Sequence, residues 1–313
     1  MRLINQFMKI IASFFTKASG FFITFHAYPN NVTQGFNSIL SDVSRVGIIV
    51  QGPFDSSHDF TIDTLRSYRK AYPNAKIVFS SWLGLDSSIV EKIKKMGIHV
   101  ILSKKTAKSI NNINLQIKST SVAIEYLKPF CDYILKTRSD QRCSTSVDFI
   151  SGFMNLLTLY PSESSELDSR LIFSSLRTFR NRLYGVPDFL MFGKTADMEL
   201  YWCIPFDTKT MEDVKREPDS DFFIREEVSE GFLVHNFFKN VNYSPTWNQE
   251  DSDEFLAKYF CVINSTEIGH FWHKYNWFLG NIYFDGNRYH IYKEITFMYW
   301  LEKYLNLSMN KIR

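Results

Sequence analysis

The chain is organised around one stretch, Tyr133-Ile134-Leu135-Lys136-Thr137-Arg138-Ser139-Asp140-Gln141-Arg142. Tyr133 to Leu135 predicts a short buried strand, and ligands of open α/β sheets bind where such strands end. The strand leads to one carboxylate, Asp140, among the cations Lys136, Arg138 and Arg142. A carboxylate can hold a divalent cation while guanidinium groups pair with phosphate oxygens, so the cluster favours a phosphate-bearing ligand. A solvated cluster of ion pairs is the alternative interpretation.

Strands and helices are expected to alternate before this stretch. The apolar runs predict strands at residues 46–50, 76–80 and 98–102, with helices at 59–72, 87–96 and 112–127. This succession predicts an α/β fold with a Rossmann-type, mostly parallel central sheet and helices on both faces. We expect one domain over residues 45–245, and an aromatic-rich C-terminal extension, residues 246–313, that packs on it.

The composition restricts the class of protein. The 313 residues are 45% hydrophobic and 16% aromatic, which is enough for a large core and excludes global disorder. The formal net charge of +3 is far below the basic bias of most nucleic-acid-binding domains, so we expect no nucleic-acid partner. The four cysteines lack the paired spacing of zinc or redox motifs, and they fit reduced thiols in the cytoplasm.

Residues 1–44 predict a peripheral N-terminal segment. Arg2, Lys9 and Lys17 alternate with an apolar helical stripe made of Leu3, Ile4, Phe7, Met8, Ile11, Phe14 and Phe15. No apolar run approaches the roughly 18 residues that span a bilayer. An amphipathic helix of this kind either lies on an anionic membrane surface or packs back on the domain.

Three loops, one of them the Arg138 to Arg142 turn, should converge at the carboxyl edge of the sheet. The first is Gln51-Gly52-Pro53, where glycine lets the backbone approach a ligand closely, and the second contains Ser81-Trp82. The helix predicted at 112–127, just before the central strand, presents polar side chains that can bind a sugar or a diphosphate. They are Asn111, Asn114, Gln116 and Lys118. An ordinary turn and a solvated helix face would look the same. The chain contains neither a G-x-G-x-x-G after the first strand nor a P-loop, which disfavours dinucleotide oxidoreductases and P-loop enzymes.

Four segments taken in order resemble a known family. They are Ile48-Ile49-Val50-Gln51-Gly52-Pro53, Phe79-Ser80-Ser81-Trp82, Asn112 to Thr120, and Leu135-Lys136-Thr137-Arg138-Ser139-Asp140. Together they are similar to the WavE lipopolysaccharide-synthesis family of bacterial glycosyltransferases with a GT-A-like fold. The resemblance implies transfer of a sugar from a nucleotide-sugar donor, with a UDP-sugar favoured, to a cell-surface glycan or a lipid-linked oligosaccharide. It places the protein in the cytoplasm, peripheral on the inner face of the cytoplasmic membrane.

The resemblance also implies roles for two acidic residues. Asp188, in Pro187-Asp188-Phe189-Leu190-Met191-Phe192-Gly193, would face the acceptor, and Glu230, in Val228-Ser229-Glu230-Gly231, would be a general base beside its hydroxyl. Glu226 and Glu227 compete with Glu230 for that role. A carboxylate in the first turn of a helix also has an ordinary stabilising role.

The chain departs from the usual metal-binding signature of this fold. That signature has two aspartates separated by one residue, whereas Arg138-Ser139-Asp140 has one. Asp140 is therefore the predicted ligand of Mn²⁺ or Mg²⁺, with arginines sharing the diphosphate charge. His270 and His273 could complete a metal site or be packed side chains.

Two other functions fit the same residues. One is a transferase that moves a polyol phosphate or sugar phosphate from a nucleotide donor, since the cationic turn would serve it equally. The other is a non-catalytic scaffold of the glycan assembly machinery, which the missing second aspartate keeps open.

Overall fold

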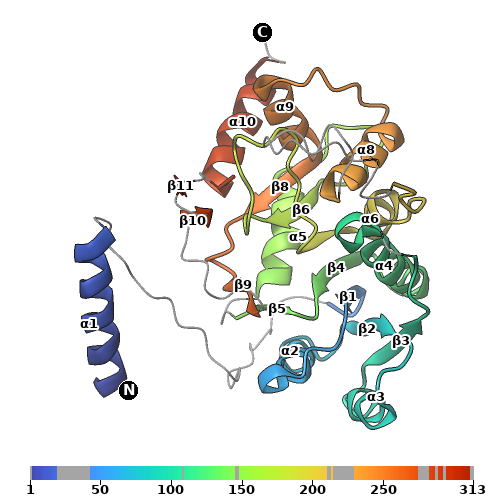
Figure 1. Ribbon diagram of the computed structural model, residues 1–313. Helices are drawn as coiled ribbons and strands as arrows, with labels where there is room; N and C mark the ends of the chain where they lie inside the picture. Colours follow the sequence, from blue (N-terminus) through green and yellow to red (C-terminus); the bar gives the residue numbers. More distant parts are fainter. Residues whose placement is uncertain are drawn as a thin grey trace.

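The centre of the molecule is a seven-stranded sheet (Figure 1). This computed structural model describes residues 2–19, 43–107, 109–144, 148–209, 213, 229–273, 282–285, 288–291 and 294–310. In spatial order the strands are β3 (His99–Ser103), β2 (Lys76–Trp82), β1 (Val46–Gln51), β4 (Tyr133–Arg138), β7 (Met191–Lys194), β6 (Leu171–Ser174) and β8 (Phe260–Ile263).

The sheet is mostly parallel. β1 pairs in parallel with β2 and with β4, β2 pairs in parallel with β3, and β6 pairs in parallel with β8. β7 alone among these strands runs the other way, because it pairs antiparallel with both β4 and β6. The predicted α/β fold with a mostly parallel sheet is confirmed.

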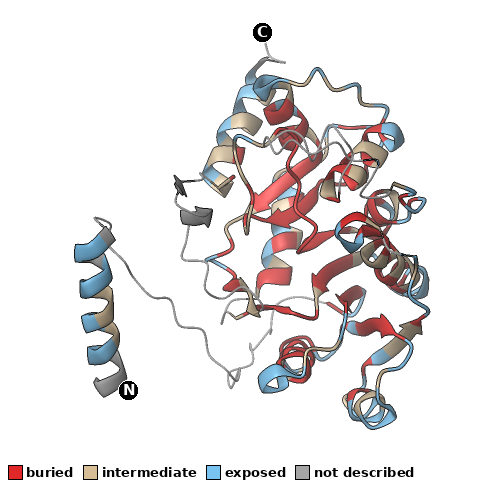
Figure 2. Ribbon diagram, in the orientation of Figure 1, coloured by how far each residue is buried: buried red, intermediate tan, exposed pale blue. Residues whose placement is uncertain are grey.

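Helices cover both faces of the first four strands. α2 (Phe60–Ala71) and α3 (Ser87–Lys94) lie on one face, and α4 (Ile113–Leu127) lies on the other. This is the arrangement that right-handed crossovers predict, because the connection through α4 runs back across the sheet from β3 to β4. Figure 1 shows α4 and the α2–α3 pair on opposite sides of β1 to β3. Gly47 lets α4 approach β1 closely, since a Cβ there would lie 2.7 Å from Leu127 Cδ1. Every residue of β1 is buried, and Figure 2 shows burial concentrated along the central strands.

The other half of the sheet uses residues from late in the chain. Its helices are α5 (Phe149–Leu159), α6 (Thr195–Trp202), α8 (Glu230–Asn240), α9 (Gln249–Tyr259) and α10 (Phe297–Asn310). The segment that we predicted to pack on the domain, residues 246–313, therefore also supplies the outermost strand, β8.

Two short strand pairs complete the fold. β5 (Gln141–Cys143) pairs antiparallel with β9 (His270–Trp272), and β10 (Ile282–Asp285) pairs with β11 (Arg288–Ile291). The β5–β9 pair brings the aromatic C-terminal region against the residues that follow β4. It therefore places late residues of the chain beside Asp140.

The N-terminal helix α1 (Arg2–Ser19) has the predicted amphipathic pattern. Several large apolar side chains on it are exposed, including Phe7 at 62%, Ile10 at 68% and Phe14 at 68%. Among the described helices, none combines the length and the apolar character needed to cross a bilayer.

Candidate active site

Two neighbouring cavities open at the carboxyl ends of β1, β2 and β4. The first cavity has a volume of about 680 Å³ and is lined by the loops after these strands together with the turn before α4. The second cavity, about 470 Å³, is lined by the loop between β6 and β7, the start of α8 and Trp272. Four residues line both cavities: Asn111, Asn112, Gln116 and Arg138. A ligand in one cavity therefore lies next to a ligand in the other.

The first cavity has a rigid floor where the loop after β1 meets the loop after β4. Ser139 N donates to Gln51 O at 2.8 Å, and Ser139 Oγ donates to Pro53 O at 2.5 Å. Gly52 has a φ of +123°, and a Cβ on it would lie 2.7 Å from Ser139 Oγ. Glycine is thus required both for the backbone conformation and for the close approach of the two loops.

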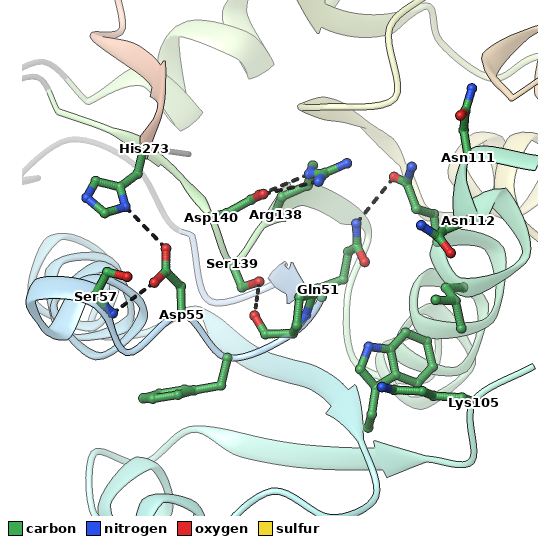
Figure 3. Close-up of a pocket in the computed structure, with 16 residues that line it drawn as sticks. Gln51, Asp55, Ser57, Lys105, Asn111, Asn112, Arg138, Ser139, Asp140 and His273 are labelled. Atoms are coloured by element: carbon green, nitrogen blue, oxygen red, sulfur yellow. Dashed lines mark hydrogen bonds and ion pairs between the residues drawn. The ribbon is translucent and has the colours of Figure 1, made fainter. Parts of the chain in front are cut away.

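Arg138 and Asp140 form the charged centre of the first cavity (Figure 3). Arg138 donates through Nε and Nη2 to the two carboxylate oxygens of Asp140, at 3.0 and 3.2 Å. Trp272 Nε1 donates to Asp140 Oδ2 at 2.8 Å. Burial favours the neutral acid, but the charge of Arg138 and these hydrogen bonds outweigh it and lower the pKa of Asp140. Asp140 therefore stays ionised and fixes the guanidinium in place.

A relay of side chains connects the two cavities. Ser119 Oγ donates to Gln51 Oε1 at 2.8 Å, and Gln51 Nε2 donates to Gln116 Oε1 at 3.5 Å. Gln116 Nε2 in turn donates to Asp188 Oδ2. Arg138 Nη1 also lies 3.8 Å from Asp188 Oδ2, so one carboxylate oxygen of Asp188 is anchored from the first cavity.

The other oxygen of Asp188 is unusual. Asp188 is only 4% exposed and lines the second cavity, yet its Oδ1 has no hydrogen-bond partner among the described residues. An unsatisfied buried carboxylate oxygen is costly and calls for an explanation such as a bound ligand. Asp188 is thus prepared to accept a hydrogen bond from a hydroxyl group in the second cavity.

Glu230 lies at the start of α8 and lines the same cavity. Burial raises the pKa of Glu230, and the charge of Asp188 raises it further. Glu230 therefore holds a proton more readily than an ordinary glutamate does. Glu226 and Glu227, the competing candidates, lie outside the described residues.

Several predicted donor-binding residues line the first cavity. The structure brings together Gln51, Gly52, Pro53, Trp82, Asn111, Gln116, Arg138 and Asp140. Asn111 and Asn112 both have left-handed backbone conformations, which asparagine tolerates, and this turn presents them to the cavity. Figure 3 shows them across the cavity from Asp55 and His273.

Arg142 is not one of these residues. It is 1% exposed, and its guanidinium donates to Thr64 Oγ1 at 2.9 Å and to Phe60 O at 3.0 Å. The ring of Phe60 lies 4.4 Å from its Cζ. The side chain of Arg142 therefore packs against α2 and joins this helix to the β5–β9 pair.

Lys136 is also buried away from both cavities. Its ammonium donates to the carbonyl oxygens of Asp188 and, at 3.4 Å, Phe189, and lies 4.3 Å from the ring centroid of Trp202. Burial lowers the pKa of Lys136 to about 7. Lys136 therefore holds the loop that carries Asp188, and it does not line the surface on which a ligand would bind.

Three further predicted residues lie outside both cavity linings. Ser81 is 2% exposed within β2. Asn114 is tied to the backbone of Asp207, donating to its carbonyl at 2.8 Å and accepting from its N–H at 2.7 Å. Lys118 is half-buried on α4 and lines neither cavity.

The two histidines have different surroundings. His270 is buried, with Nδ1 2.9 Å from Ser174 Oγ and Nε2 3.2 Å from Gln141 Oε1, and burial lowers its pKa to about 3. His273 lines the first cavity, and its Nδ1 lies 3.2 Å from Asp55 Oδ2. Within the described part of the chain, no three histidine, cysteine or acidic residues are grouped so that they could hold a metal ion.

Sequence reasoning missed several residues that line the cavities. Trp272 and Asp140 are 132 residues apart in sequence, and the pairing of β5 with β9 brings them together. Asp55, Lys105, Arg177 and Arg182 also line the cavities. The available signals were the aromatic C-terminal segment around His270 and the arginine-rich stretch that contains Arg177 and Arg182.

The chain belongs to the WavE lipopolysaccharide synthesis family, because the sequence model of that family matches residues 46–312. No curated protein matches it. Among solved structures, it is similar to 4-diphosphocytidyl-2C-methyl-D-erythritol synthase from Anaerococcus prevotii DSM 20548, with 11% identity, a TM-score of 0.37, and 72% of this chain and 90% of that chain covered. It is also similar to residues 1–349 of TarS from S. aureus, with 14% identity and a TM-score of 0.38. The match covers 69% of this chain and 70% of that chain.

Proposed function

We propose that this protein is a GT-A-like glycosyltransferase that moves a sugar from a nucleotide-sugar donor, a UDP-sugar by preference, to a cell-surface glycan or a lipid-linked oligosaccharide. Lipopolysaccharide core, O-antigen and capsule are the candidate products. Membership of the lipopolysaccharide synthesis family supports the pathway. The observation that carries the reaction is Asp188 Oδ1, which is buried without a hydrogen-bond partner among the described residues in the second cavity, next to the first cavity built around Arg138.

The first cavity suits the donor. Arg138 can pair with diphosphate oxygens, and Asp140 and Trp272 preorganise its guanidinium for that contact. Trp82 offers an aromatic surface for a base, and Gln51, Asn111 and Gln116 offer amides for ribose or sugar hydroxyls. Lys105 adds a further cation to the lining.

The second cavity suits the acceptor. In the proposed reaction an acceptor hydroxyl oxygen forms a bond to the anomeric carbon, and the bond from that carbon to the diphosphate oxygen breaks. The bonding pair leaves with the nucleoside diphosphate, whose added negative charge Arg138 stabilises. The hydroxyl proton passes to Asp188 Oδ1, and this direct displacement inverts the configuration at the sugar carbon.

Asp188 is the better candidate for the base at neutral pH. Its Oδ2 is held by Gln116, whereas its Oδ1 has no partner among the described residues and can accept the proton. Glu230 has a raised pKa, so it is suited to hold a proton and to donate a hydrogen bond to the acceptor. The two acidic residues predicted to face the acceptor would then have different roles.

The described residues do not fit a metal ion held by the protein alone. Asp140 is the predicted ligand, but both of its oxygens already accept hydrogen bonds from Arg138 or Trp272. No second carboxylate or histidine joins it in a group of three among the described residues. Dependence on Mn²⁺ or Mg²⁺ stays a prediction, and EDTA treatment followed by measurement of donor turnover tests it: loss of activity that Mn²⁺ restores would support a metal ligated chiefly by the diphosphate.

Donor hydrolysis across a panel of nucleotide sugars tests the proposal, followed by mass analysis of products formed with a cell-surface glycan extract. A gain of one sugar mass on the acceptor is expected. A gain that includes phosphate would instead support the polyol-phosphate or sugar-phosphate transferase. Failure of UDP, GDP, CDP and ADP to bind in calorimetry would favour the non-catalytic scaffold.

We also propose that α1 holds the protein on the inner face of the cytoplasmic membrane. Arg2, Lys9 and Lys17 are its charged residues, and no acidic residue offsets them. With exposed Phe7, Ile10 and Phe14, this combination suits an anionic bilayer surface. Flotation of the full chain with anionic vesicles, but not with neutral ones, is the expected result, and Phe7→Ser/Phe14→Ser should abolish it.

A further inference from the structure

Lys136 is a buried cation in the middle of the sheet. It is 0% exposed on β4, between β1 and β7. Its ammonium donates to the main-chain oxygens of Asp188 and, at 3.4 Å, Phe189. Within the described part of the chain it forms no ion pair with a carboxylate. A buried charge without a direct counterion is costly, so this position calls for an explanation beyond stability.

Asp188 is held by two cations from the same face of β4. Lys136 and Arg138 are two residues apart in one strand, so their side chains leave the sheet on the same side. Arg138 Nη1 lies 3.8 Å from Asp188 Oδ2, to which Gln116 also donates, while Lys136 holds the main-chain oxygen of Asp188. The main chain and Oδ2 of Asp188 are therefore both held, whereas Oδ1 has no partner among the described residues.

The ammonium of Lys136 is shielded from water. The ring centroid of Trp202, a buried residue of α6, lies 4.3 Å from Nζ. Burial lowers the pKa of Lys136 from 10.5 to about 7, and the charge of Asp188 acts in the opposite direction. Charges interact strongly where water is excluded, because the effective dielectric constant is low. The positive charge of Lys136 and the negative charge of Asp188 therefore stabilise each other.

Other ionisable groups face this pair from the surrounding elements. They are Arg138 and Asp140 from β4 and its turn, Tyr201 from α6, Glu230 from α8, His270 from β9, and Arg177 and Arg182 from the loop between β6 and β7. After burial, the charge of Asp188 has the largest influence on the pKa of Lys136, and it acts to raise that pKa. Lys136 and Asp188 are thus the dominant charge pair of this group.

We infer that Lys136 is a positioning residue for the proposed base: its ammonium holds the main chain at Asp188, and its charge favours the ionised carboxylate that can accept a proton. Lys136 keeps its own proton in the reaction and does not touch the acceptor. The inference rests on the proposed function, because it explains how the base of that reaction is supported. Coupling between two groups is reciprocal, so loss of either charge should disfavour the other.

The first test measures this coupling without any substrate. The full chain is labelled with carbon-13 at the lysine Cε atoms, and each lysine signal is followed by NMR as the pH is raised. One signal is expected to titrate at about pH 7, well below the other lysines. Asp188→Asn should lower the midpoint of that signal by about one pH unit. Loss of the signal in Lys136→Arg assigns it.

A matched substitution controls for net charge. Asp168→Asn makes the same change at a carboxylate whose side chain is 65% accessible, so it should leave the midpoint of the Lys136 signal in place. The inference is overturned if no lysine midpoint moves in Asp188→Asn, or if the midpoint falls equally in Asp168→Asn.

The second test uses the dependence of kcat on pH. Lys136→Met keeps the length of the side chain without its charge, so it should lower kcat and move the fall of kcat in acid to a pH about one unit higher. The Kd for UDP should change by less than about twofold. Lys136→Arg keeps the charge and should keep the acid side of the wild-type profile. Lys128→Met, at a side chain that is 54% accessible, is the control.

The shape of the pH profile distinguishes positioning from a purely structural role. A structural role would lower kcat in Lys136→Met and leave the acid side of the profile in place, and this result overturns the inference. Thermal unfolding of each variant shows whether it folds, and the titration of Asp188→Asn decides the matter if Lys136→Met does not.

The outcomes also separate the inference from the proposed function. An unmoved lysine midpoint overturns the role of Lys136 and leaves the glycosyltransferase standing wherever UDP binds. Failure of UDP, GDP, CDP and ADP to bind overturns the glycosyltransferase itself, whereas the lysine titration, which needs no sugar, still shows whether Lys136 and Asp188 are coupled.

Discussion

The two cavities differ in how the chain builds them. Most of the first cavity comes from loops that directly follow β1, β2 and β4 and from the turn before α4, so neighbouring strands of one parallel sheet bring its residues together. The second cavity gathers the β6–β7 loop, the start of α8 and Trp272 from β9. The first has a carboxylate that is fully engaged, Asp140, whereas the second has one with a free oxygen, Asp188. Under the proposed function, the first cavity binds charge and the second transfers a proton.

The largest expected effect is on turnover, from Asp188→Asn. Loss of the proton acceptor should lower kcat about 100-fold to 10,000-fold with little change in the Kd for UDP, because the amide keeps the shape of the side chain. Glu230→Gln is the matched comparison and should cost much less, since the pKa of Glu230 is raised and its proposed state is protonated. Equal losses in the two variants would contradict the division of roles between these residues.

His270 tests the strand pair that joins the cavities. Its pKa is lowered to about 3 by burial, below the ordinary 6.5. Between these values the unfolded chain binds a proton that the folded chain does not, so the free energy of unfolding falls as pH decreases from 6.5 to 3. The loss should reach up to about 4 kcal/mol. Urea unfolding across this range measures it.

The control variants for His270 have distinct expected outcomes. His270→Asn should be less stable at pH 7 but should show a flatter acid dependence, because the amide does not titrate. His58 is exposed, and asparagine tolerates its φ of +53°. His58→Asn should therefore show the same dependence of the free energy of unfolding on pH as the wild type. If the free energy of unfolding of His270→Asn falls with pH as steeply as that of the wild type, another group governs stability in acid.

Arg138 and Arg142 offer a test within a single stretch. Arg138→Gln should weaken UDP binding by about 10-fold to 100-fold, the value of one or two charge-assisted hydrogen bonds. Arg142→Gln should instead lower the free energy of unfolding by about 3 kcal/mol, because it removes buried bonds to Thr64 and Phe60. Calorimetry with UDP and urea unfolding on both variants measure the two effects. A large loss of UDP affinity in a folded Arg142→Gln protein would return this residue to the donor site.

The smallest expected effect comes from Trp272→Phe. Phenylalanine keeps a ring beside Arg138 and Arg177 but loses the N–H that donates to Asp140, so UDP affinity should fall several-fold. Trp300→Phe is the control, because its indole donates to Leu256 and Phe260 carbonyls in the core. That variant should change the melting temperature and leave UDP binding intact. A Trp272→Phe protein with unchanged affinity would show that Arg138 needs no support from the C-terminal region.

Much of the fold was predictable from local sequence. Compact apolar runs such as 46–50 and 76–80, separated by amphipathic helices, gave strands and crossovers within a few residues of those observed. The first cavity follows from the same pattern, because the carboxyl ends of neighbouring parallel strands share one edge. Gln51, Trp82, Arg138 and Asp140 could be placed there for that reason.

The rest depends on contacts between distant segments. The direction of Arg142 could not be read from its neighbours in sequence, because its partners, Thr64 and Phe60, lie on α2 about 80 residues earlier in the chain. Lys136 is similar, since only the folded β6–β7 loop supplies the carbonyls that it contacts. Alternation within a strand shows which residues share a face. It does not show what will cover that face.

The late position of β9 also has a consequence for biosynthesis. Strands β1 to β4 and their helices are made first and can pair with one another as they leave the ribosome, whereas β9 ends at Trp272. Until then Asp140 lacks its indole partner, and the second cavity lacks one wall. A nascent chain can therefore pair β1 to β4 well before it acquires the proposed reaction centre, and prematurely terminated chains should not consume activated sugars.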